Sequence, residues 1–265
     1  MSIGSRLARG RLSRLAIMGP MSEATPEAPA RALPRRGRAW VALILALARL
    51  ALGYTIVTAS TKEAGSDVVK IAGIEDTQKI FGGVPQEGDR FGSSNAPVTI
   101  QLFNDVQCSS CRDDFVKAMP ALSEKYVRPG DVQLVYRHYS NSESPMELGF
   151  FGAEAAADQG YGWQYIYLFF RNQEEAQRFG VNDEFLDSVA GSIGELDVPE
   201  WKKYLEDESG PEGAIAKALE ADEELGRGLQ IRYGQAAIVT GPNGTRTIQD
   251  GATLGQIERA IAAVE

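Results

Sequence analysis

Cysteine and histidine are scarce in this chain of 265 residues, which contains only Cys108, Cys111 and His138. Two cysteines cannot form the several crosslinks of a disulfide-rich secreted scaffold. Two thiols and one imidazole are too few for a four-ligand zinc site, so we expect no metal and no other cofactor. Residue 112 is arginine, whereas covalent haem attachment requires a histidine after the second cysteine. The cysteines are therefore expected to form a redox pair.

Positive charge is scarce outside the N-terminal region. The whole chain has a formal charge of −9. Residues 1–60 contain nine arginines against two glutamates, a charge of +7, which leaves −16 for residues 61–265. Nucleic-acid phosphates would be repelled by so acidic a domain, so we do not expect a nucleic-acid partner.

The N-terminal region divides into a basic and an apolar segment. Residues 1–38 are rich in arginine, proline and alanine and are expected to form a cytoplasmic leader. Residues 39–59 are mostly apolar and about as long as the ~20-residue helix that crosses a bilayer. The positive-inside rule then places residues 61–265 outside the cell membrane. Arg49 near mid-span and the small-residue sequence at Val57–Ala59 leave a cleaved signal peptide, and hence a secreted protein, as the alternative.

The remaining chain is expected to be a short tether followed by one α/β domain. Residues 60–87 combine glycine, serine, proline and charged residues, as is typical of a tether. Within residues 88–265, Val98–Phe103 is β-branched and apolar, which predicts a buried strand. This strand leads within a few residues into Cys108. The cysteines are therefore expected at the junction of a strand and a helix.

A helix and a second strand are predicted directly after the cysteines. Apolar residues recur every three or four positions from Cys111 to about Tyr126, which predicts an amphipathic helix. Pro120 lacks a backbone donor and should kink that helix. Residues Val132–Arg137 follow as a predicted strand, and strand, helix and strand together predict a parallel βαβ unit.

The last part of the domain is predicted to contain a helical insertion and a terminal hairpin. Residues 144–226, approximately, consist of helical stretches separated by Gly, Pro and Asn, and are too long for a simple crossover. Two predicted strands, Ala236–Thr240 and Thr245–Gln249, flank a Gly-Pro-Asn-Gly turn. The closing helix, predicted at Leu254–Val264, follows a capping box formed by Thr253 and Gln256.

The position of the cysteines carries the chemical prediction. A helix N-terminus favours the thiolate of the first cysteine of a Cys-x-x-Cys pair, and the thiolate is the species that attacks disulfides. We therefore predict Cys108 as the nucleophile and Cys111 as the resolving thiol, with Ser109 and Ser110 between them. The alternative is an inert disulfide or a pair of core thiols.

The sequence resembles a known family over Gly88–Ala262. The run GDRFGSSNAPVTIQLFNDVQCSSCRDDFVKAMPALSEKYV is similar to the DsbA-like thiol–disulfide oxidoreductases of the thioredoxin superfamily, especially the membrane-anchored forms of actinobacteria. The resemblance implies a thioredoxin-like α/β fold with an inserted helical subdomain. It also implies disulfide exchange on exported proteins outside the cytoplasmic membrane, with a redox partner in the membrane. We expect an oxidase rather than a reductase or isomerase.

The chain departs from the family pattern opposite the cysteines. The family usually has a proline with a cis peptide bond before the penultimate strand, and the substrate backbone binds there. Here Gln235 and Ala236 take these positions, and we expect them to contact substrate. Leu102 replaces a frequent buried acid, so Asp105 either serves in proton transfer or caps the turn. These departures keep a second hypothesis open, a non-catalytic thioredoxin-like binding module with a static disulfide.

Overall fold

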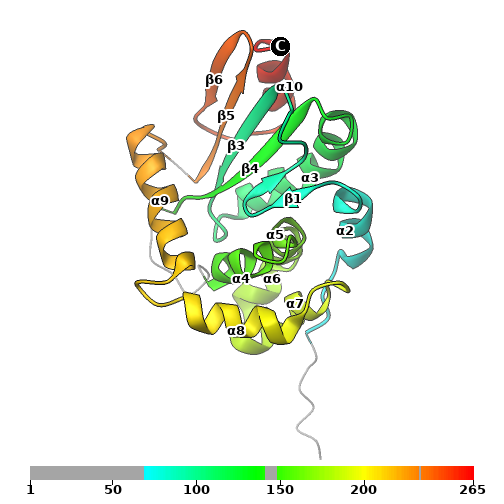
Figure 1. The fold of residues 1–265 in the computed structure, drawn as a ribbon, viewed down its shortest axis with the longest axis vertical. Helices are drawn as coiled ribbons and strands as arrows, with labels where there is room; N and C mark the ends of the chain where they lie inside the picture. Colours follow the sequence, from blue (N-terminus) through cyan, green and yellow to red (C-terminus); the bar gives the residue numbers. More distant parts are fainter. Residues whose placement is uncertain (1–68, 141–147, 233) are drawn as a thin grey trace, which may run out of the picture. The chain divides into compact units, whose positions relative to one another are not determined.

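The computed structural model describes residues 69–140, 148–232 and 234–265 (Figure 1). The predicted leader at 1–38, the predicted anchor at 39–59 and the start of the predicted tether lie outside these residues. Among the helices that the structure describes, none has the length and apolar character needed to cross a membrane.

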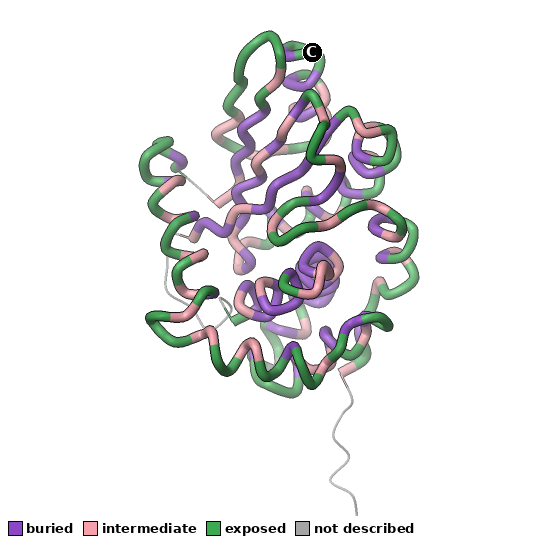
Figure 2. Tube along the Cα trace, in the orientation of Figure 1, coloured by how far each residue is buried: buried purple, intermediate pink, exposed green. Residues whose placement is uncertain are grey.

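A mixed sheet forms the centre of the fold, with strand order β1-β2-β4-β3-β5-β6. The strands are β1 (Gln86–Glu87), β2 (Arg90–Phe91), β3 (Val98–Asn104), β4 (Val132–His138), β5 (Gln235–Gly241) and β6 (Gly244–Ile248). Among the described strands, only β3 and β4 pair in parallel, as the βαβ prediction required, and the other neighbouring strands pair antiparallel. The apolar residues of β3 and β4 are buried because helices cover the sheet (Figures 1 and 2).

The helix after the cysteines has the predicted position and changes its winding near the predicted kink. Helix α3 spans Ser109–Leu122 and continues as the π-helix η1 at Ser123–Val127. Pro120 has no N–H to donate within α3. The amide of Arg128 bonds to the carbonyl of Ser123, five residues earlier, at 2.9 Å. A wider turn therefore follows the proline, as is common where the regular helical ladder is interrupted.

The helical insertion between β4 and β5 is confirmed for its described part. It consists of α4 (Leu148–Ala157), α5 (Gly162–Arg171), α6 (Gln173–Phe179), α7 (Asp183–Gly191), α8 (Val198–Glu208) and α9 (Ala214–Gly228). Two of these helices begin at side-chain caps. Asn182 accepts a hydrogen bond from the amide of Phe185, and Asp197 accepts one from the amide of Glu200.

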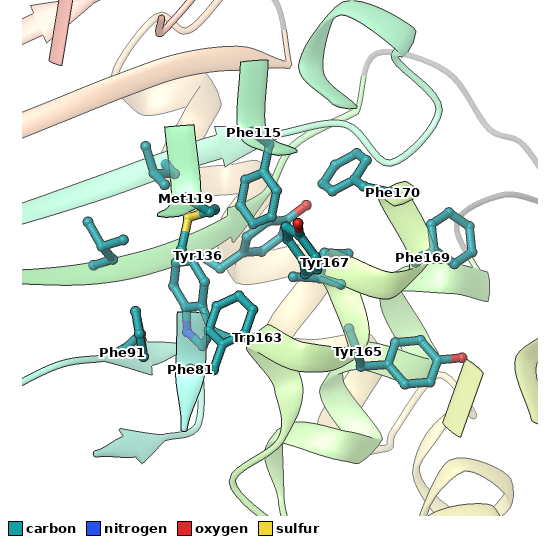
Figure 3. Close-up of a cluster of buried hydrophobic side chains, with 14 of the residues drawn as sticks. Phe81, Phe91, Phe115, Met119, Tyr136, Trp163, Tyr165, Tyr167, Phe169 and Phe170 are labelled. Atoms are coloured by element: carbon teal, nitrogen blue, oxygen red, sulfur yellow. The ribbon is translucent and has the colours of Figure 1, made fainter. Parts of the chain in front are cut away.

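Aromatic side chains fill the space between the sheet and the helical insertion (Figure 3). Phe115 of α3 lies 5.1 Å from Phe170 of α5, measured between ring centroids, and 6.3 Å from Trp163. Gly152 permits α4 to approach α5, because a Cβ at this position would lie 2.3 Å from the hydroxyl of Tyr165. The insertion and the sheet therefore share one hydrophobic core.

The structure differs from the sequence prediction in the region expected to be a tether. Helix α2 (Ile74–Phe81) and strand β1 lie within residues 60–87, and α2 buries Ile80 and Phe81 in the core. The backbone of Ala72 is fixed by Asn172, which accepts its amide at 2.8 Å and donates to its carbonyl at 3.1 Å. The buried residues Ile80 and Phe81 lie three and four positions after the buried Thr77, as on one face of a helix, but α2 is only eight residues long, so this period is too short to stand out in the sequence.

The C-terminal elements follow the prediction closely. Strands β5 and β6 form the expected hairpin, and helix α10 (Leu254–Ala262) follows it. The capping box is present, with the Thr253 hydroxyl and the Gln256 side chain at the start of α10.

Candidate redox site

The two cysteines lie where strand β3 passes into helix α3. Cys108 is the N-cap residue of α3, and its sulfur accepts a hydrogen bond from the amide of Cys111 at 3.1 Å. The two residues form a disulfide, with 5.2 Å between their Cα atoms. Cys111 is completely buried, whereas Cys108 is half-buried. An attacking thiolate therefore reaches the sulfur of Cys108 rather than that of Cys111.

The turn ahead of Cys108 is held by Asp105. Its carboxylate accepts hydrogen bonds from the amide of Gln107 at 2.8 Å and from the hydroxyl of Ser140 at 3.1 Å. Its carbonyl accepts the amide of Cys108 at 3.1 Å. Burial raises the pKa of Asp105 above its ordinary value, although both hydrogen bonds act in the opposite direction. The contacts confirm the turn-capping role considered from the sequence.

A glutamine from the helical insertion also holds this turn. Gln173, at the start of α6, is fully buried. Its Nε2 donates to the carbonyl of Val106 at 2.7 Å and to that of Cys108 at 3.3 Å. The sequence does not predict this contact, because a single glutamine at a helix start carries no pattern that indicates contact with a segment 65 to 67 residues earlier.

Gly234 brings the start of β5 against the redox pair. Its carbonyl accepts the amide of Asp105 at 2.9 Å and lies 2.8 Å from the sulfur of Cys111. A Cβ at residue 234 would lie 2.5 Å from both the Cβ of Asp105 and the carbonyl oxygen of Tyr139. Only glycine permits this approach.

Gln235 lies beside the redox pair, as the sequence suggested. Its Nε2 donates to a carboxylate oxygen of Asp114 at 2.5 Å and to the carbonyl of Ser110 at 3.3 Å. Its Oε1 accepts the hydroxyl of Ser110 at 3.3 Å. The side chain therefore links the start of β5 to the first turn of α3.

Ala236 packs elsewhere. It is 1% exposed and belongs to a small apolar cluster with Phe103, Tyr139, Ile231 and Ile238, separate from the main core that contains Cys111. The structure thus brings Gln235, but not the side chain of Ala236, to the cysteines. The role of both residues in substrate binding stays a prediction.

Charged and titratable groups near the cysteines are engaged with one another. The guanidinium of Arg112 pairs with Asp113 at 2.9 Å and with Glu174 at 3.1 Å, so these carboxylates offset its positive charge. Leu102 is buried in the main core, so an apolar side chain occupies the position where related proteins often have a buried acid. No group of three or more His, Cys, Asp or Glu side chains within the described ranges is arranged to bind a metal ion.

His138 lies in strand β4 and has a structural environment. It is fully buried, and its ring stacks on Phe150 with 4.3 Å between centroids. Burial lowers the pKa of His138 to about 4, so the ring is neutral at physiological pH. Neither ring nitrogen has a hydrogen-bond partner among the described residues.

This arrangement defines a protein of the thioredoxin class: a Cys-x-x-Cys disulfide at the first turn of the helix in a parallel βαβ unit, with an antiparallel strand beside it. The sequence profile of a family described as Thioredoxin matches residues 86–224, more than half of the chain. The chain therefore belongs to this thioredoxin family.

Individual relatives support the DsbA-like prediction. A "Probable disulfide bond formation protein D" of Bacillus cereus is 26% identical over 153 residues, which cover 57% of this chain and 68% of that protein. Oxidised BdbD from Bacillus subtilis has a similar fold, with a TM-score of 0.56, 20% identity and coverage of 68% of this chain and 96% of that one. DsbA2 from Pseudomonas aeruginosa gives a TM-score of 0.51 at 20% identity, with coverage of 69% and 97%. The predicted DsbA-like membership of the thioredoxin superfamily is confirmed.

Proposed function

We propose that this protein is a thiol–disulfide oxidoreductase that exchanges disulfides with exported proteins through Cys108 and Cys111. The observation that carries the proposal is the difference between the two sulfurs. Cys108 is half-buried at the helix N-terminus, and Cys111 is completely buried one turn further along. This asymmetry suits a nucleophile that meets substrate and a resolving thiol that meets only its partner.

In the oxidising direction, a substrate thiolate attacks the sulfur of Cys108. A mixed disulfide forms, and the electron pair of the broken sulfur–sulfur bond leaves with Cys111, which takes up a proton. A second substrate thiolate then attacks the substrate sulfur of the mixed disulfide, and Cys108 leaves as a thiolate. The substrate gains a disulfide and loses two electrons, which the Cys108–Cys111 pair retains as two reduced sulfurs.

The helix terminus favours this direction. Backbone amides at the start of α3 that have no acceptor within the helix, such as that of Cys111, stabilise a thiolate at Cys108 and hence the reduced protein. A stabilised reduced form makes the disulfide a stronger oxidant. The relatives named for disulfide bond formation are consistent with an oxidase. Electrons would then pass from the reduced pair to a redox partner in the membrane.

The proposed location follows from the N-terminal sequence. The apolar segment at 39–59 would anchor the protein, with the thioredoxin domain outside the cytoplasmic membrane. A reporter enzyme active only after export, fused after residue 265, should be active and remain with the membrane fraction. An active but released reporter would indicate cleavage near Val57–Ala59, and an inactive reporter would contradict export.

The enzymatic proposal is tested on the full-length chain with a disulfide substrate. Cys108→Ser should abolish exchange, whereas Cys111→Ser should trap a mixed disulfide at Cys108, because the resolving thiol is missing. Equal rates for wild type and Cys108→Ser would contradict the proposal and favour the static binding module. A redox equilibrium with glutathione measures the reduction potential, and a value well above that of glutathione would support an oxidase.

A further inference from the structure

Ser110 lies between the nucleophile and a glutamine. Its hydroxyl oxygen is 3.2 Å from the sulfur of Cys108 and 3.3 Å from Oε1 of Gln235. A serine hydroxyl has one proton and can donate it to only one of these acceptors at a time. The redox state of Cys108 determines which acceptor is stronger.

In the disulfide state the hydroxyl donates to Gln235. A disulfide sulfur is uncharged and a weak acceptor, whereas an amide oxygen is a good one. The orientation of the Gln235 amide is fixed by Asp114, because a carboxylate accepts hydrogen bonds and must therefore face the NH₂ group. Oε1 is consequently directed at Ser110, and Gln235 keeps this orientation whether or not the hydroxyl bonds to it.

In the reduced state the balance is reversed. The thiolate of Cys108 carries a full negative charge, and hydrogen bonds to charged acceptors are about twice as strong as neutral ones. Gln235 is half-buried, so water can replace the hydroxyl at Oε1. A rotation about the serine side chain suffices to move the proton from one acceptor to the other.

We propose that Ser110 is a positioning residue whose hydroxyl donates to Gln235 in the disulfide state and to the Cys108 thiolate in the reduced state. This inference rests on the proposed function and specifies how its redox pair is tuned. The exchange occurs in the step that releases substrate, when the electron pair of the mixed disulfide passes to the sulfur of Cys108. The serine proton stays on its oxygen throughout, so no additional proton or electron is required.

The matched variants are Ser110→Thr and Ser110→Val, which have nearly the same shape and differ in the hydroxyl. The first measurement is alkylation of Cys108 by iodoacetamide as a function of pH, in full-length protein that also carries Cys111→Ser. Ser110→Thr should keep the wild-type midpoint, and Ser110→Val should raise it by about one pH unit, because a charge-assisted hydrogen bond to the thiolate is lost. Equal midpoints for the two variants would overturn the proposal.

The second measurement is the redox equilibrium of the intact pair with glutathione. Ser110→Val should favour the disulfide about tenfold relative to Ser110→Thr, a potential ~30 mV more negative. Gln235→Met removes the amide acceptor, destabilises the disulfide state and should make the potential less negative. This effect should vanish when Gln235→Met is combined with Ser110→Val. The same effect in both backgrounds would show that the hydroxyl does not leave Gln235 on reduction.

These measurements need no protein substrate, so they are independent of turnover. If wild-type protein exchanges substrate disulfides but Ser110→Thr and Ser110→Val behave alike, the serine proposal is wrong and the enzymatic one stands. If Cys108→Ser matches wild type in the exchange assay, the enzymatic proposal is wrong, and with it the tuning of a catalytic pair.

Discussion

The side-chain nitrogen of Gln173 donates a hydrogen bond to the carbonyl of Val106 at 2.7 Å, so a helix of the insertion holds the backbone just ahead of Cys108. The same nitrogen lies 3.3 Å from the carbonyl of Cys108. In the thioredoxin-like fold of this chain the insertion therefore does more than extend the core. It fixes the turn that precedes Cys108, the proposed nucleophile.

Replacing Gln173 should affect both stability and exchange. Gln173→Leu keeps the approximate size of the side chain but leaves the carbonyl of Val106 without its donor. We expect a loss of about 1–3 kcal/mol in the free energy of unfolding, measured by urea denaturation with the disulfide intact, and slower exchange. Glu175→Gln, at a surface pair with Arg178, is the control and should change stability by less than about 0.5 kcal/mol. Normal stability with Gln173→Leu would show that this contact is dispensable.

His138 should make the protein sensitive to acid. Its pKa of about 4 in the folded state lies below the ordinary 6.5, so the unfolded chain binds the proton more readily. Stability is therefore lost as the pH falls from about 6.5 towards 4. His138→Phe preserves the stacking on Phe150 and removes the titration. The free energy of unfolding of the variant minus that of wild type should be about 2 kcal/mol larger at pH 5 than at pH 8. If this difference does not change with pH, His138 is not buried in its neutral form.

Glu154 should have the opposite pH dependence. Burial, followed by repulsion from Asp222 and Asp89, raises its pKa from 4.5 to about 7. The folded state then binds the proton more readily than the unfolded chain, so stability is lost as the pH rises from about 4.5 through 7. Glu154→Gln should stabilise the protein by ~1–3 kcal/mol at pH 8 and have little effect near pH 4.5. The measurement is urea denaturation across this pH range.

The surface change Glu175→Gln serves again as the carboxyl-to-amide control for Glu154, and it should give no comparable pH-dependent gain. A gain from Glu154→Gln that is the same at pH 4.5 and pH 8 would show that the carboxyl group is not desolvated.

Proline at position 236 should be unfavourable in this chain. Phe103 and Ala236 are opposed residues of β3 and β5. Opposed pairs alternate between bonded and non-bonded classes. The amide of Asp105 donates to the carbonyl of Gly234, so these two opposed residues form a hydrogen-bonded pair. Phe103 and Ala236 are opposed two positions further along the same strands, so they also form a hydrogen-bonded pair.

Ala236→Pro removes the donor of that pair and adds bulk to a buried position. We expect a loss of about 1–3 kcal/mol in stability and no increase in the exchange rate. Ala236→Ser, which keeps the backbone donor, is the control. Faster exchange by the proline variant would show that the site tolerates the residue usual in the family.

Local patterns predicted the elements that carry the redox pair. The apolar run before Cys108 predicted β3 because this strand is buried inside the sheet. The helical period after Cys111 predicted α3 because this helix buries one face. The capping box of Thr253 and Gln256 was also predictable, because this interaction spans only one turn of helix.

Interactions between distant segments were not predictable in this way. Helix α2 is only eight residues long, so its amphipathic pattern was too short to distinguish residues 74–81 from a tether before their packing on the core was known. Gln235 was noted for its sequence position, but its contacts with Ser110 and Asp114 depend on how β5 aligns with α3. The burial of His138 depends on α4 covering β4.

The sequence by itself determined the redox pair, its place at a strand-to-helix junction and the order of the surrounding elements, since these follow from spacing and periodicity along the chain. The tertiary structure decided that Cys108 is more exposed than Cys111. It also decided that Gln173 holds the turn ahead of Cys108 and that Gln235 holds the first turn of α3. Those contacts join residues 65 or more positions apart, and such pairings arise only when the insertion and β5 pack against the sheet.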